Sequence, residues 1–187
     1  DRARALFAGS AAHSVVPFST PGSAAIGIVL SAVGHVRGWP VPRGGSQRIA
    51  DALVAQLRSL GGEIITNRSI ETHGHLPAAK YLLFDTSPRA MARIMGDRLP
   101  ASFSRKLERH AYGPGVFKID WALNGPIPWK ARECLEAATV HVGGTLDEIA
   151  TAEAAPWRGA HAERPFVLVT QPSLFDPSRA PAGKHTA

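Results

Sequence analysis

The stretch that decides the fold reads Trp39-Pro-Val-Pro-Arg-Gly-Gly-Ser46, and a helical pattern follows it as far as Gly61-Gly62. Ser46 suits a helix N-cap, because its hydroxyl can accept a hydrogen bond from a free backbone N–H of the first turn. Within the pattern, apolar residues recur at intervals of three and four, which places them on one helix face. These residues are Ile49, Leu53, Leu57 and Leu60. The sequence therefore predicts an amphipathic helix over about residues 46–60, ended by the glycine pair.

Apolar runs after this helix predict β-strands. Residues 80–84 are predicted as a strand, because Tyr81–Phe84 form a continuous apolar run that suits a buried strand of a layered α/β sheet, and residues 63–66 are predicted as a shorter strand. Residues 114–123 alternate in polarity, which is typical of a half-buried antiparallel strand. Residues 139–142 and 165–170 add two more predicted strands.

Helical patterns occupy much of the remaining chain. The predicted helices cover residues 2–8, 23–36, 88–95, 100–109 and 146–155. The last of them opens with a capping box, because Thr145 is followed three residues later by Glu148. Residues 9–22 and 171–187 are expected to be irregular. This order of elements predicts an α+β, or mixed α/β, fold in which an antiparallel or mixed sheet is flanked by helices.

The composition narrows the class of protein. The chain has 187 residues and carries 21 Lys and Arg against 15 Asp and Glu, but these basic residues are scattered and are not interleaved with aromatic ones, so nucleic-acid binding is not expected. Cys134 is the single cysteine, which fits a reducing compartment, and we expect a cytoplasmic protein. Residues 24–36 are too short and too polar for a membrane span. The positive charge leaves a peripheral membrane contact as an alternative.

Further motifs extend the pattern that begins at Trp39. After the helix, Gly61-Gly-Glu-Ile-Ile-Thr-Asn-Arg-Ser-Ile70 is followed by Tyr81-Leu-Leu-Phe-Asp-Thr-Ser-Pro88. Later motifs lie at residues 110–121, 126–129, 139–144 and 171–181. On these motifs, over essentially its whole length, the chain resembles the phytoene dehydrogenase-like branch of FAD-dependent, amine oxidase-type flavoproteins.

The resemblance implies a division of the chain between two domains of such a flavoprotein. Residues 1–38 would form the helical part of the substrate domain, residues 39–88 would contribute to the FAD-binding domain, and residues 89–187 would supply the sheet and helices of the substrate domain. The family's flavin fold opens with a G-x-G-x-x-G turn that holds the pyrophosphate, and this motif is absent here. We therefore expect an internal part of a longer protein, which does not bind FAD by itself.

Cofactor-binding residues are implied by the resemblance at two places. Gly44 and Gly45 would form a tight turn close to FAD, where a Cβ would clash, and the alternative is a simple helix-entry turn. The turn from Asn67 to Ile70 would bring backbone groups beside the adenine, and the alternative is an ordinary turn at a strand end.

Substrate-binding candidates are His13, Trp39, Lys118 and Trp121. Each has a structural alternative: a satisfied histidine, core packing for the tryptophans, and an ion pair with Asp120 for the lysine. His141 is weighed in the same way as His13. His73 and His75 have no third ligand at a useful spacing, so no metal site is predicted.

The function implied by the resemblance is hydride transfer from an apolar or amine-bearing small molecule to FAD. No acid–base constellation stands out, which fits chemistry that depends mainly on placing the substrate against the flavin. The catalytic residues are therefore not identified, and this chain alone is expected to be inactive. Two alternatives stay open: a non-catalytic binding or interaction module, and a flavoprotein without net redox chemistry.

Overall fold

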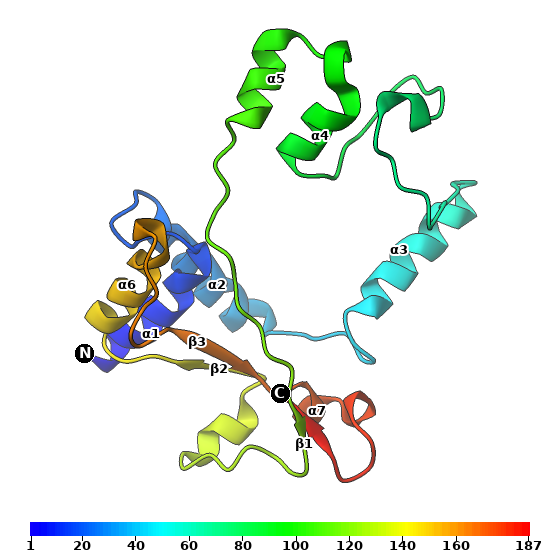
Figure 1. The fold of residues 1–187 in the computed structure, drawn as a ribbon. Coiled ribbons are helices and arrows are strands. Elements are labelled where there is room, and N and C mark those ends of the chain that lie inside the picture. Colours follow the sequence, from blue (N-terminus) through cyan, green and yellow to red (C-terminus); the bar gives the residue numbers. More distant parts are fainter. The chain divides into compact units, whose positions relative to one another are not determined.

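The computed structural model describes residues 1–187 and combines helices with two small sheets (Figure 1). The α-helices are α1 (Arg2–Ala11), α2 (Ser23–Arg37), α3 (Gln47–Ser59), α4 (Pro88–Met95), α5 (Ala101–Glu108), α6 (Leu146–Ala154) and α7 (Pro172–Phe175). Strand β2 (Thr139–Val142) pairs antiparallel with β3 (Val167–Thr170), and β1 (Ala122–Leu123) pairs antiparallel with β4 (His185–Thr186). The predicted α+β class is confirmed.

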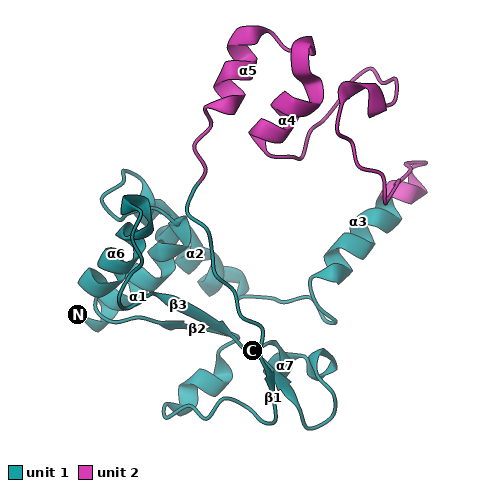
Figure 2. Cartoon of the chain, viewed as in Figure 1, with its two compact units in different colours: residues 1–56, 113–187 teal, residues 57–112 magenta.

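Two compact units divide the chain (Figure 2). The first unit contains residues 1–56 and 113–187, and the second contains residues 57–112. The predicted division between a substrate domain and a flavin-domain segment, with boundaries at residues 38 and 88, stays a prediction.

The core of the first unit lies where α1 meets α2 and α6. Buried Ala8 of α1 and Ala12 of the short helix η1 (Ala12–Ser14) pack with Ile149 of α6. Partly buried hydrophobic residues also pack against this cluster: Phe18, Leu146 and Phe166. Gly27 brings α2 close to α1, because a Cβ at this position would lie 3.1 Å from the backbone nitrogen of Ala11. The small residues therefore set a short distance between these two helices.

A polar network fixes the segment between β1 and β2 in the first unit. The side chain of Gln171 is almost fully buried, with 2% of its surface exposed. Its Oε1 accepts from the indole Nε1 of Trp129 at 2.8 Å, and its Nε2 donates to the carbonyls of Cys134 and Ala137 at 2.8 and 3.1 Å. The Gln171 side-chain amide therefore satisfies one N–H group and two carbonyl groups of the segment between β1 and β2.

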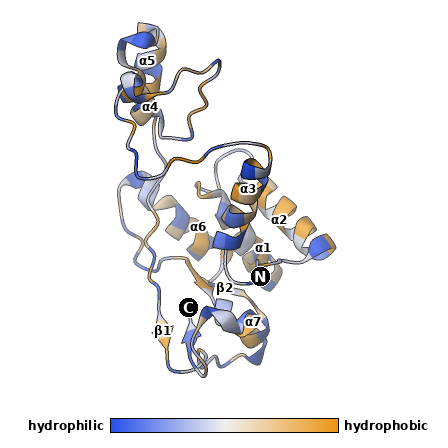
Figure 3. Ribbon diagram, turned by 90° about the vertical axis from the view of Figure 1, so that its right-hand side faces the viewer, coloured by the Kyte–Doolittle hydropathy of each residue, from blue (hydrophilic) through white to orange (hydrophobic).

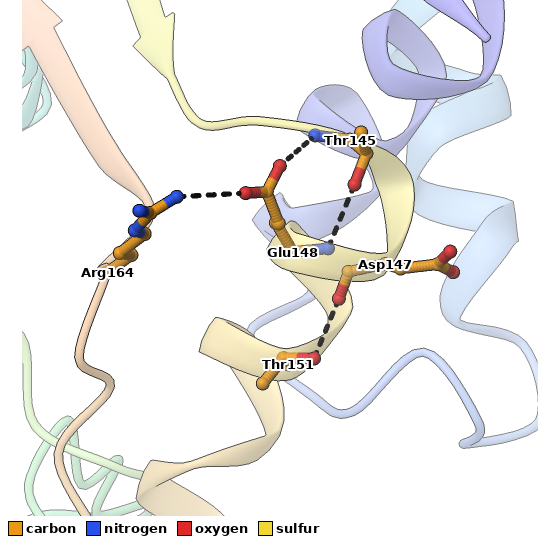
Figure 4. Close-up of polar contacts among 5 residues, drawn as sticks. All are labelled: Thr145, Asp147, Glu148, Thr151 and Arg164. Carbon is orange, nitrogen blue, oxygen red and sulfur yellow. Dashed lines mark hydrogen bonds and ion pairs between the residues drawn. The ribbon is translucent and has the colours of Figure 1, made fainter.

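Helix α6 begins with the predicted capping box (Figure 4). The backbone N–H of Glu148 donates to the Thr145 hydroxyl at 3.3 Å, and the Thr145 N–H donates to the Glu148 carboxylate at 2.8 Å. Arg164 pairs with the second carboxylate oxygen at 3.3 Å. A Cβ on Gly144 would overlap this carboxylate, so a larger residue before the cap would have to displace the Glu148 side chain. These bonds hold the pKa of Glu148 below its usual value, first through the Thr145 N–H.

The second unit is built on the packing of α4 against α5. Ser87 caps α4, where it accepts from the Ala90 N–H at 3.3 Å. Arg89 donates to the carbonyls of Glu108 and His110 at 3.2 and 3.4 Å, and its guanidinium lies 5.0 Å from the centre of the Tyr112 ring. This arginine therefore joins the start of α4 to free carbonyls at the end of α5.

Several predicted strands are wrong. Residues 63–66 and 80–84 are extended but pair with no strand, and within 114–123 only Ala122 and Leu123 are in a ladder. A strand needs a neighbour for its backbone N–H and C=O groups, and this chain supplies none at these places. Two loops are also more regular than predicted: α1 reaches Ala11, and residues 171–187 contain α7 and β4.

Large apolar surfaces of α2 and α3 face solvent, and Figure 3 shows apolar colouring along α2. No residue of α3 is buried. Its predicted apolar stripe is exposed throughout, at 54% for Ile49, 67% for Leu53, 44% for Leu57 and, just past the helix, 76% for Leu60. An amphipathic helix normally turns such a stripe toward a core. The described chain does not provide that cover.

Candidate functional site

The turn that carries Gly44 and Gly45 is held by a distant segment of the same unit. The two glycines have φ values of +82° and +94°, which L-amino acids with a side chain rarely adopt. The Gly44 N–H donates to Asp176 Oδ2 at 2.5 Å, and Arg179 Nη1 donates to the Gly44 carbonyl at 2.9 Å. The backbone N–H and C=O of Gly44 are therefore both hydrogen-bonded by residues more than 130 positions away in the sequence.

Asp176 is organised to receive these bonds. Its side chain caps the short helix Pro177–Arg179 and accepts from the Ser178 hydroxyl and N–H at 2.7 and 3.1 Å. Only 8% of the residue is exposed. The Ser178 hydroxyl, the Gly44 N–H and the charge of Arg179 lower the pKa of Asp176. The carboxylate is therefore ionised at neutral pH and acts as the acceptor that joins the two segments.

Gly45 lets the Arg179 side chain come close to the backbone of the turn. A Cβ on Gly45 would overlap the guanidinium of Arg179. The space left by the missing side chain is therefore filled by Arg179, and these two glycines do not by themselves offer an open surface to the dinucleotide that the resemblance implies.

The other two cofactor candidates lie in the second unit. Asn67 has a φ of +58° in the segment after α3, a conformation that asparagine tolerates better than most residues, and its side chain is exposed. Ile70 is half-buried in the same loop. The chain bends at Asn67, and the use of this segment in adenine binding stays a prediction.

Trp121 borders an open, mostly apolar pocket of about 390 Å³ in the first unit. The wall is formed by Leu123, Pro126, Ile127, Pro128 and Val169. The backbone of Trp121 is fixed by two hydrogen bonds with Ala187, of 2.8 and 3.2 Å, which extend the β1–β4 ladder. A hollow with one exposed aromatic ring and few polar groups suits a small apolar ligand.

Lys118 and Trp39 lie in other surroundings. Lys118 pairs with Asp120 at 2.5 Å, and both side chains are more than three-quarters exposed. This is the solvated ion pair that the sequence offered as an alternative. The Trp39 ring lies against α2, because a Cβ on Gly34 would meet its indole nitrogen at 2.6 Å. Neither residue lines the Trp121 pocket.

His13 meets His141, a residue far away in sequence. The two Nε2 atoms are 3.1 Å apart and the ring centres are 5.0 Å apart. Phe166 presents an edge-to-face contact to His141, with ring centres 5.5 Å apart. Partial burial, and then the nearby His13, lower the pKa of His141. His13 and His141, which were separate candidates in the sequence analysis, are therefore neighbours in the structure.

Sequence reasoning missed the partners of several predicted residues. Asp176 and Gln171 were read as parts of an irregular tail. A signal for Asp176 exists, because Asp before Pro-Ser-Arg is a typical start of a helical turn. No local signal indicates Gln171, because its partners, the Trp129 indole and two backbone carbonyls, are brought together only by the fold.

Comparison with known proteins adds no relative. No family model, no curated protein and no solved structure matches the chain. None of its helices combines the length and the apolar composition needed to cross a bilayer. The resemblance to the flavoprotein group is carried by sequence motifs alone and stays a prediction.

Replacement of Gly45 by alanine is expected to destabilise the first unit more than the same change at Gly22. Both glycines have a strongly positive φ, +94° and +86°, and share a backbone penalty of about 1–2 kcal/mol. A Cβ at Gly22 meets nothing within 4 Å, whereas at Gly45 it meets Arg179. Urea unfolding of the two variants measures the difference. Equal losses would contradict the prediction and show that displacing the Arg179 side chain from the turn has no measurable cost.

The contribution of Asp176 to stability is expected to depend on pH. Because its pKa is lower in the folded chain, the ionised form stabilises the fold above the unfolded pKa of about 3.9, and this stabilisation disappears as the pH falls through the folded pKa. The unfolding free energies of the wild type and of Asp176→Asn should therefore differ by a nearly constant amount above about pH 5, and converge as the pH falls from about 4 through the lower folded pKa. A difference that stays constant below about pH 4 as well would contradict the assignment.

Proposed function

We propose that these residues form part of the substrate domain of an FAD-dependent oxidoreductase of the phytoene dehydrogenase-like group. The reaction would remove a hydride from an apolar or amine-bearing small molecule. The observation that carries the proposal is the Gly44–Gly45 turn, which leads directly into α3 with its uncovered apolar stripe. Such an arrangement is expected where the substrate domain passes into a flavin domain that covers the helix.

Exposed apolar residues beyond α3 support the same proposal. Ile65, Tyr81 and Leu83 are 65%, 76% and 97% exposed, in the two extended segments that have no strand partner. A sheet supplied by another part of a flavoprotein would pair their backbones and bury their side chains together. On this proposal, residues 63–66 and 80–84 form no strand in this chain because their strand neighbours would belong to the other part of the flavoprotein.

The pocket beside Trp121 supports an apolar substrate. The chain's own residues would hold such a molecule by contact with the indole and the proline-rich wall, and would exclude water from that side. FAD would supply the hydride acceptor. The residues of this chain would orient the substrate, and none of them is assigned a bond-breaking role.

A non-catalytic binding module is the second candidate function. The observation that favours it is the close contact of Arg179 with Gly45, because it explains the glycine pair without any cofactor. On this interpretation, the exposed faces of α2 and α3 would bind a protein partner.

Visible absorbance separates the two functions. We compare the purified 187-residue chain with a longer polypeptide in which the upstream and downstream residues of its reading frame are restored. The proposal predicts a flavin spectrum in the longer protein alone, because the chain has no G-x-G-x-x-G turn. Bleaching of that spectrum by an apolar or amine-bearing compound would then report hydride transfer. A longer polypeptide without flavin would overturn the proposal and favour the binding module.

A further inference from the structure

The histidine pair lies on two elements of the first unit that are fixed by different contacts. His13 belongs to the short helix Ala12–Ser14 at the end of α1, next to the buried Ala11 and Ala12. His141 belongs to β2, where its backbone pairs with Leu168 of β3. The two positions are 128 residues apart, so no spacing rule in the sequence could indicate the pair.

The immediate surroundings hold the His141 ring in place. Its Nδ1 side faces Gly9, where a Cβ would lie only 2.9 Å from Nδ1. The Phe166 edge contacts the ring at a tilt of 69°. The glycine therefore leaves room for the imidazole, and the aromatic ring restricts its rotation.

The distance between the two Nε2 atoms fits joint coordination of one cation. Imidazole nitrogens bind Zn²⁺ at about 2.0–2.1 Å, so two of them in a tetrahedral site stand about 3.3 Å apart. Two neighbouring nitrogens at about a right angle on a square-planar ion stand about 2.9 Å apart. The observed 3.1 Å lies between these values. The same distance permits a hydrogen bond between the rings when no ion is present.

We infer that His13 and His141 form a binding site for a divalent cation that prefers nitrogen ligands, of which Zn²⁺ is the representative. Both residues are exposed, so water can complete the coordination. No group of three or more His, Cys, Asp or Glu side chains is assembled in the described chain, so the pair provides two ligands only. Neutral imidazoles select Zn²⁺, Cu²⁺ and Ni²⁺ over Mg²⁺ and Ca²⁺, which prefer oxygen.

Zn²⁺ titration of the 187-residue chain by calorimetry tests the site. The wild type should bind one Zn²⁺ at this site, and His13→Ala and His141→Ala should each weaken that binding at least tenfold. Gly9→Ala keeps both ligands but crowds His141, and should also weaken binding. The matched control is His73→Ala with His75→Ala, which removes two histidines that are neighbours in the sequence and should leave the affinity unchanged. Mg²⁺ should not compete.

Three results would overturn the inference. They are the absence of saturable Zn²⁺ binding, unchanged binding in His13→Ala, and loss of binding in the His73/His75 control. Circular dichroism of each variant shows that it remains folded. His13→Ala is the decisive variant because its exposed side chain can be removed with little effect on the core.

Discussion

The folding of this chain is limited by how little apolar surface its residues can cover among themselves. Seven hydrophobic residues are buried, and all of them are alanines except Ile94 and Ile149. The chain exposes 14588 Å², whereas two separate globules of the sizes of its two units would expose about 10,000 Å² together. Large hydrophobic residues are exposed on α2, on α3 and in the segments at 63–66 and 80–84, among other places. Apolar burial is the main stabilising term in folding, so these faces contribute little to the stability of the chain by itself, and cover by another polypeptide surface stays a proposal.

Buried hydrogen bonds hold together parts of the first unit that lie outside its small apolar core. Gln171 and Asp176 are buried, and each joins segments that are far apart in the sequence. Such groups are costly when unpaired, and for that reason they specify one arrangement when all their partners are present. The glycine turn at residues 44–45 and the tail at residues 171–181 are thereby held together. Both segments belong to the motifs on which the family resemblance rests.

The sequence predicts the helices of this fold well and its strands poorly, for physical reasons. A helix satisfies its own backbone, so the periodicity of α3 and the Thr145–Glu148 box were sufficient to place α3 and α6. A strand depends on hydrogen bonds to a neighbouring strand. Residues 63–66 and 80–84 have no such neighbour in this chain, so they do not form the predicted strands. The same distinction applies to the site. The glycine turn has a local signal, whereas the His13–His141 pair and the partners of Gln171 arise only from the fold.

The central claim is that α3 and the extended segments at 63–66 and 80–84 are completed by another part of a flavoprotein. Hydrogen–deuterium exchange measures this directly, when the 187-residue chain is compared with the longer polypeptide. The account predicts rapid amide exchange at residues 63–66 and 80–84 in the chain alone, and strong protection of the same amides in the longer protein. Equal exchange in the two proteins would contradict it.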